Sequence, residues 1–104
     1  MDLKQEFPLH EDEELHVATD TDQGLIAVTD RRLIVKHAER IALDLPLEDI
    51  RRIQFDVERA RPATLVVVPH SPSHPPEVMS VPVERLEPVS RMVYIIGDRL
   101  GRLD

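Results

Sequence analysis

The sequence predicts a mainly β domain of 104 residues that ends in one amphipathic α-helix. Two observations carry this prediction. Between Leu15 and Val83, apolar residues recur at every second position in short runs, which is the period of a strand with one buried face. From about Glu84 the apolar residues recur at steps of three and four, which is the period of a helix. Six or seven short strands followed by one helix describe a small curled sheet plugged by that helix.

The clearest hairpin has its turn at Asp30-Arg31. This turn pairs Ile26 with Val35 and Val28 with Leu33, so four apolar side chains share one face. A slip of one residue would scatter them over both faces, so the register is nearly fixed. We expect Asp30 to stabilise the corner, because Asp tolerates positive φ and can accept hydrogen bonds from nearby backbone N–H groups.

Two neighbouring hairpins are predicted to extend the same face. A four-residue loop over 20–23 pairs Val17 with Ile26, and a three-residue turn over 38–40 follows the central hairpin. With these loops, nine apolar residues fall on one sheet surface: Leu15, Val17, Ile26, Val28, Leu33, Val35, Ile41, Leu43 and Leu45. Agreement among independent local patterns favours an antiparallel meander.

Pro46 ends this meander, because proline cannot donate a ladder hydrogen bond. Residues 47–50 form a short corner, and the alternation then resumes in a strand whose apolar positions are Ile53, Phe55 and Val57.

Two further strands are predicted before the helix. Residues 63–68 are β-branched and apolar on both faces, which indicates a central strand covered by other parts of the molecule. The Pro-rich stretch 69–76 is a loop, and 77–83 forms a Pro-interrupted edge strand.

The helix is predicted over about 86–102, since Pro88 is tolerated only in a first turn. Gly97 lies beside the apolar stripe and would allow close approach to a sheet, and Gly101 would stop the helix. The stripe consists of Leu86, Val89, Met92, Val93, Ile96, Leu100 and Leu103. The chain then forms a single domain, 1–104, with a polar lead-in over 1–12 and strands over about 13–83.

Composition excludes several classes of function. A net charge of −7 disfavours nucleic acid and anionic lipid as general partners, and an aromatic content of 3% leaves no stacking platform for bases. The absence of Cys removes disulfides and thiolate chemistry, and the first residues lack a signal-peptide pattern. We therefore expect a cytoplasmic domain.

Several segments, in order, resemble one known family. They are an acidic lead-in at 11–14, Leu15-His16-Val17-Ala18, the run from Gly24 to Leu33, and the run from Leu45 to Ile50 with Ile53 after it. Together with the terminal helix, they resemble the bacterial pleckstrin-homology-like (PH-like) domains and are similar to the related GRAM domains. The resemblance covers roughly residues 11–102.

The resemblance implies a fold rather than a reaction. Its most specific parts, Thr29-Asp30-Arg31-Arg32-Leu33 and Leu45-Pro46-Leu47-Glu48-Asp49-Ile50, shape the backbone and carry no catalytic motif. It implies two roughly orthogonal antiparallel sheets that form a partly open barrel, with the helix capping one end. That fold hosts headgroup binding, peptide binding and scaffolding alike.

Two charged groups bear on lipid binding. Phosphoinositide-binding members of the superfamily carry Lys and Arg at the first hairpin, whereas here 20–23 reads Asp-Thr-Asp-Gln and would repel phosphate. The best basic cluster is Arg31 and Arg32 with Lys36. In the expected register Arg32 and Lys36 point away from the core beside Ile34. The cluster is either a solvated face or a patch for an acidic peptide or headgroup.

No catalytic, cofactor-binding or metal-binding residues are expected. His70 and His74 are four apart, but Pro72 forbids the helix that would bring them together, and no third ligand is near in sequence. The chain also has no nucleophile elbow, no phosphate-cradling glycine loop and no Cys.

The function predicted is a non-enzymatic interaction module that docks a peptide or forms a weak homodimer. The contact is expected at the outer helix face or at an adjacent sheet edge, where an extended peptide can add as a strand. On the helix, its expected centre is Ile95, in a largely basic frame of Arg91, Asp98, Arg99 and Arg102. The acidic run 11–14 could supply complementary charge from a second copy. The alternatives are a lone exposed apolar residue without function, a peripheral lipid binder, and a small metal-binding or enzymatic protein. The identity of the partner is not encoded in a recognisable motif.

Overall fold

The computed structural model describes residues 7–103, with side chains described for 7–101. The elements in chain order are β1 (Leu15–Thr21), β2 (Gly24–Thr29), β3 (Arg32–His37), β4 (Arg40–Pro46), the 3₁₀ turn η2 (Leu47–Asp49), β5 (Ile50–Asp56), β6 (Ala63–Pro69), β7 (Glu77–Val81), the 3₁₀ turn η3 (Val83–Arg85) and α1 (Leu86–Leu103).

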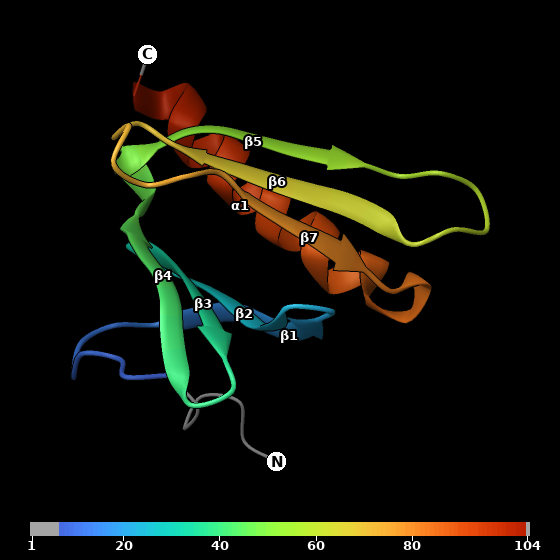
Figure 1. Ribbon diagram of the computed structural model, residues 1–104. Helices are drawn as coiled ribbons and strands as arrows, with labels where there is room; N and C mark the ends of the chain where they lie inside the picture. Colours follow the sequence, from blue (N-terminus) through green and yellow to red (C-terminus); the bar gives the residue numbers. More distant parts are fainter. Residues whose placement is uncertain (1–6, 104) are drawn as a thin grey trace.

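The seven strands form two antiparallel sheets, which confirms the prediction of a mainly β fold with one C-terminal helix. The first sheet has the order β1-β2-β3-β4 and the second the order β5-β6-β7. Their strands run in different directions, and α1 lies along the second sheet (Figure 1). Pro46 is the last residue of β4, as predicted, and η2 then carries the chain from one sheet to the other. Neither sheet closes on itself.

The helix and the inner faces of both sheets share one hydrophobic core. The predicted helical stripe is confirmed for its described side chains: Val89, Met92 and Ile96 are buried, and the others pack around them. The side chain of Leu103 lies outside the described residues. The inner sheet faces supply the rest of the core, including Ile26, Val28, Leu33, Val35, Leu43, Leu45, Ile50, Leu65, Val67, Met79 and Val81.

The central hairpin has the predicted register, with Ile26 opposite Val35 and Val28 opposite Leu33. Thr29 and Asp30 both make hydrogen bonds at its corner, and the Asp30 carboxylate accepts one from the Glu14 N–H at 3.1 Å. The Thr29 hydroxyl accepts hydrogen bonds from the backbone N–H groups of Arg31 at 3.1 Å and Arg32 at 3.0 Å. Asp30 does not adopt positive φ.

The first hairpin departs from prediction. Its turn has two residues, Asp22 and Gln23, so Val17 faces Val28 rather than Ile26. Gly24 follows at φ 124°, and a Cβ there would collide with the carbonyl oxygen of Lys36, so glycine is required.

Two β-bulges move two of the nine predicted core residues off the shared face. The bulge at the start of β1 turns Leu15 to the outer face of the first sheet, where it packs with Ile34. The second bulge is in β4. Val35 faces Leu43 as predicted, but Lys36 faces Ile41, so Ala42 is the extra residue on β4. Ile41 therefore leaves the shared face and is 36% exposed. The predicted three-residue turn is replaced by two residues, the first at positive φ.

The second sheet and the helix bring four smaller corrections. Val57 lies beyond β5 and is 55% exposed, and β7 ends at Val81 instead of residue 83. Gly97 is exposed, with no atom within 4 Å of a built Cβ, so it allows no close approach to a sheet. The helix also continues past Gly101.

Candidate functional site

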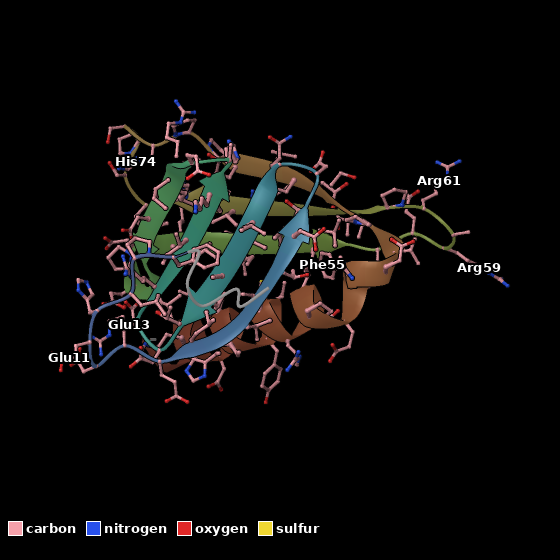
Figure 2. The ribbon with its side chains drawn as sticks, turned by 90° about the horizontal axis from the view of Figure 1, so that it is seen from below. Glu11, Glu13, Phe55, Arg59, Arg61 and His74 are labelled. Atoms are coloured by element: carbon pink, nitrogen blue, oxygen red, sulfur yellow. The ribbon has the colours of Figure 1, made fainter. Side chains whose placement is uncertain are left out.

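Residues 7–14, here called the N-terminal strap, cover the outer face of the first sheet (Figure 2). Phe7 is 5% exposed and packs with Ala27 and Ile34, which are fully buried. The outer face of this sheet is therefore an interior surface, although the sequence predicts that side chains beside Ile34 point to solvent.

Arg32 lies under the strap, and its guanidinium donates four hydrogen bonds. Its Nε donates to Glu13 Oε2 at 2.8 Å and its Nη2 to Glu13 Oε1 at 2.8 Å, which is a bidentate pair. Its Nη1 donates to Asp44 Oδ2 at 2.7 Å, and Nη2 also donates to the Pro8 carbonyl oxygen at 2.7 Å. The guanidinium thus fastens the strap to the sheet.

The charge state of this pair is firmly fixed. Hydrogen bonds from Arg32, from the Thr29 hydroxyl at 2.6 Å and from the His10 backbone N–H lower the pKa of Glu13 to about 2, against the opposing effect of burial. The carboxylates of Glu13 and Asp44 raise the pKa of Arg32. The Glu13 side chain has no exposed surface, so this residue does not belong to a solvated acidic run.

The other members of the predicted basic cluster are also engaged or screened. Arg31 is within 3.3 Å of both Asp12 and Asp30, and these carboxylates raise the pKa of its guanidinium. Lys36 is half-buried on β3. Arg31 and Arg32 line one hollow of about 480 Å³ together with Asp44 and Glu48, and Lys36 is not part of its lining. The structure therefore brings two of the three predicted cations together, beside carboxylates that offset their charge.

The acidic first hairpin loop has a structural role. Asp20 lies in β1 next to the turn and accepts from Arg85 Nε at 2.6 Å, which joins this end of the hairpin to η3. Asp22 joins it to β7, because its carboxylate accepts from the Ser80 N–H at 2.8 Å and its own N–H donates to the Ser80 carbonyl oxygen at 3.2 Å. These carboxylates bind the two sheets together at this corner.

The two loop histidines line a polar hollow of about 410 Å³ beside η2. Its other lining residues include Asp44 and Asp49, and the His70 N–H donates to the Asp49 carbonyl oxygen at 2.9 Å. Among the described residues, no group of three or more His, Cys, Asp or Glu side chains is arranged to hold a metal ion.

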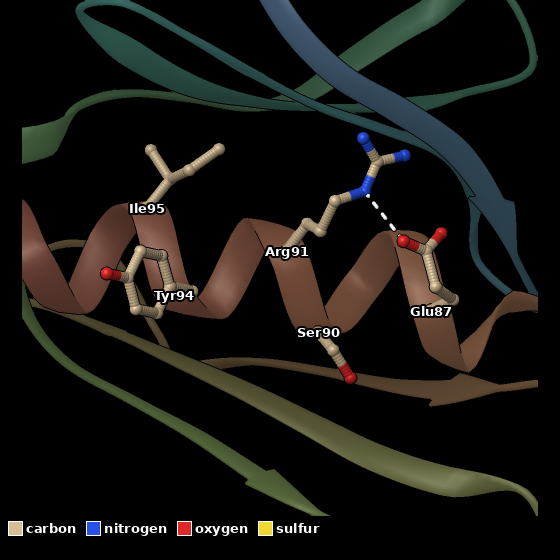
Figure 3. A pocket seen from close by; sticks show the side chains of 5 residues that line it. All are labelled: Glu87, Ser90, Arg91, Tyr94 and Ile95. Atoms are coloured by element: carbon tan, nitrogen blue, oxygen red, sulfur yellow. Dashed lines mark ion pairs between the residues drawn. The ribbon is translucent and has the colours of Figure 1, made fainter.

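The outward face of α1 carries a shallow hollow of about 350 Å³ whose lining is mostly carbon (Figure 3). Glu87, Ser90, Arg91, Tyr94 and Ile95 line it. Tyr94 is 75% exposed, the highest value for a large hydrophobic residue in the described part of the chain. Arg91 Nε is 3.0 Å from Glu87 Oε1, so an ion pair one helical turn long borders the hollow.

This hollow is here called the helix-face site, and its centre is Tyr94 rather than the predicted Ile95. Ile95 is half-buried and packs against the core, so Tyr94 is the protruding residue. Arg91 is neutralised by Glu87, and Arg99 is half-buried, so the frame is less basic than predicted. The side chain of Arg102 lies outside the described residues.

Glu87 and Ser90 line the site but were not predicted to do so. The helical period could have identified them, because residues four apart lie on the same face of a helix. Glu87 is four residues before Arg91, and Ser90 is four residues before Tyr94. Among the described helices, none combines the length and the apolar character needed to cross a membrane. Comparisons of the chain with protein-family models, with curated proteins and with solved structures found no match.

Proposed function

We propose that this chain is a non-enzymatic protein-interaction domain that binds a partner protein or peptide through the helix-face site. The observation that carries the proposal is the exposed Tyr94 at a mostly apolar hollow on an otherwise polar helix face. Aromatic residues beside such hollows are frequent anchors of protein interfaces, because they bury a large area at a small entropic cost.

We further propose that the fold is PH-like, with the two sheets forming a partly open barrel capped by α1. The support is the order of elements, four strands and then three strands followed by one C-terminal helix that shares a core with both sheets. This fold leaves the outer helix face exposed.

The ion pair between Arg91 and Glu87 would help to orient a partner bound at the helix-face site. Arg91 and Glu87 are held together at 3.0 Å, and their side chains are 59% and 74% exposed. A partner that places an apolar side chain on Tyr94 meets both charges at the border of the hollow, where a polar rim is usual in protein interfaces.

One observation favours a second candidate, peripheral headgroup binding. The loop between β5 and β6 projects from the molecule with Arg59 and Arg61 near its end (Figure 2). Against it, Glu58 is 3.6 Å from Arg61, and the chain carries a net charge of −7. Two arginines on an acidic domain supply little attraction to an anionic surface.

The test is retention of partners by the immobilised domain from native lysate, compared between Tyr94→Glu and Val57→Glu. Val57 is a matched control, because it is 55% exposed and lies in a loop outside the site. Ile95→Glu is the poorer variant, since Ile95 packs against the core and its loss would weaken the fold.

We expect Tyr94→Glu to lose a defined set of proteins that Val57→Glu retains, with both variants melting within a few degrees of the wild type. Equal retention by wild type and Tyr94→Glu would contradict the helix-face site.

A further inference from the structure

The outer face of the second sheet is the one large sheet surface that the described chain leaves uncovered. The strap buries the outer face of the first sheet, but no such segment covers β6. Val66 and Val68 on this face are half-buried, and Val78 beside Val66 is 56% exposed. The sequence pattern of β6, apolar on both faces, predicts a cover that the described residues do not supply.

Strand register defines the chemistry of this face. Three rows run across the sheet, and the central row is Gln54, Val66 and Val78. On one side of it lie Arg52 and Val68, and on the other side Asp56, Thr64 and Ser80.

Arg52 and Asp56 are therefore opposite charges placed symmetrically about the central row. Both are exposed. Gln54 Nε2 donates to Asp56 Oδ2 at 3.1 Å, which holds the carboxylate on this face, and Arg52 makes no ion pair with the described residues. A symmetric arrangement of one cation and one anion is complementary to a copy of itself.

From this arrangement we propose that the face is an interface between two copies of this chain. A two-fold axis parallel to the sheet, across the strands and over the central row, stacks β5 on the partner's β5 in the opposite direction. Arg52 then faces the partner's Asp56, and the reverse pair forms by symmetry, while Val66 lies against the partner's Val66. Aligned packing of two sheets about 10 Å apart is the usual geometry for such a contact.

The alternative axis, along the strands, would stack β5 on the partner's β7 and would pair neither charge. The charges therefore select one orientation. The face is small, roughly 14 by 17 Å for three strands of five residues, which is well below the ~800 Å² per partner of stable complexes. We expect a weak dimer, with a Kd on the order of 0.1 mM.

This interface is independent of the helix-face site, because α1 packs against the inner face of the same sheet. Tyr94→Glu should leave the dimer intact, and the interface variants should leave partner binding at the helix-face site intact. Failure of one proposal is thus distinguishable from failure of the other.

The test is sedimentation equilibrium of the full chain between about 10 µM and about 1 mM, the range that brackets the expected Kd. Arg52→Asp and Asp56→Arg should each weaken the dimer at least about tenfold, because each places like charges opposite one another. The double variant Arg52→Asp/Asp56→Arg restores both pairs and should return to within about threefold of the wild type.

A matched pair of valine variants tests the apolar part of the face. Val78→Lys should abolish the dimer, whereas Val57→Lys, at nearly the same exposure but off the face, should preserve it. A wild type that stays monomeric throughout the range would overturn the proposal and leave the face to solvent or to a different protein. A dimer that tolerates Arg52→Asp, or a double variant that fails to recover, would also overturn it.

Discussion

Arg32 looks like part of a surface binding patch in the sequence, but in the structure it is a buried residue that holds the strap on the sheet. On a strand next to Arg31 and near Lys36 it contributes to an apparent basic cluster. In the fold it is 9% exposed and bound by Glu13, Asp44 and a backbone carbonyl. These partners lie 19, 12 and 24 residues away in the sequence, so local sequence offers no direct sign of them.

The Glu13–Arg32 pair predicts an acid sensitivity. The pKa of Glu13 is lowered from 4.5 to about 2, so its stabilising effect is complete above pH 4.5 and is lost as the pH falls toward 2. The change in the free energy of unfolding from this group is on the order of 3 kcal/mol. Urea denaturation at a series of pH values measures it.

Glu13→Gln should be less stable than the wild type at pH 7, by roughly 3 kcal/mol, because it leaves a buried guanidinium short of a charged partner. Its stability should also vary less between pH 4.5 and pH 2. Glu11→Gln is the control, since Glu11 is exposed and should behave as the wild type. Parallel pH curves for Glu13→Gln and the wild type would contradict the assignment.

At the level of elements, hydrophobic period predicts strands and their pairing well, and bulges poorly. The register of β2, β3 and the last part of β4 follows from alternation alone, because any slip would expose Val28 or Leu33. A bulge inserts one extra residue into a strand, so the side chains on one side of the bulge point to the opposite face of the sheet from the one that alternation predicts. Leu15 and Ile41 keep a strand-like pattern in sequence and still change faces.

Truncation of matched residues tests this reading of the first sheet. Leu33 is fully buried, so Leu33→Ala should cost about 2–4 kcal/mol through lost burial and a cavity. Ile41 is 36% exposed because of the bulge, so Ile41→Ala should cost about 1 kcal/mol or less. Chemical denaturation gives both values, and equal costs would show that Ile41 shares the buried face.

At the scale of the whole molecule, the charge balance bears on membranes. Arg31 and Arg32 of the central hairpin form ion pairs with carboxylates of the same chain, namely Asp12, Asp30, Glu13 and Asp44. The chain as a whole has a net charge of −7. Purified protein should therefore show no salt-sensitive binding to anionic liposomes, including liposomes with phosphoinositides, in a flotation assay. Headgroup-selective binding at micromolar concentration would move the assignment to a lipid-binding domain, and loss of that binding in Arg59→Ala/Arg61→Ala would locate it.

The sequence predicts the helix, its buried stripe and the existence of an outer face, because these follow from the 3.6-residue period. It does not predict which outer residue protrudes. Ile95 borders the stripe and packs inward, while Tyr94 points away, and that difference depends on how the helix is rotated against the two sheets. The strap was not predicted either, since its two apolar contacts, Phe7 and Leu9, stand in a mostly polar stretch with no strand or helix period.

The most direct test of the central claim is site-specific photo-crosslinking from the helix-face site in native cells. A photoreactive phenylalanine derivative replaces Tyr94 in one variant and Val57 in another, so both probes are exposed and only one lies at the site. We predict a discrete crosslinked protein adduct from position 94 and none of the same mass from position 57. The same adducts from both positions, or none from position 94, would contradict a partner-binding role for this face.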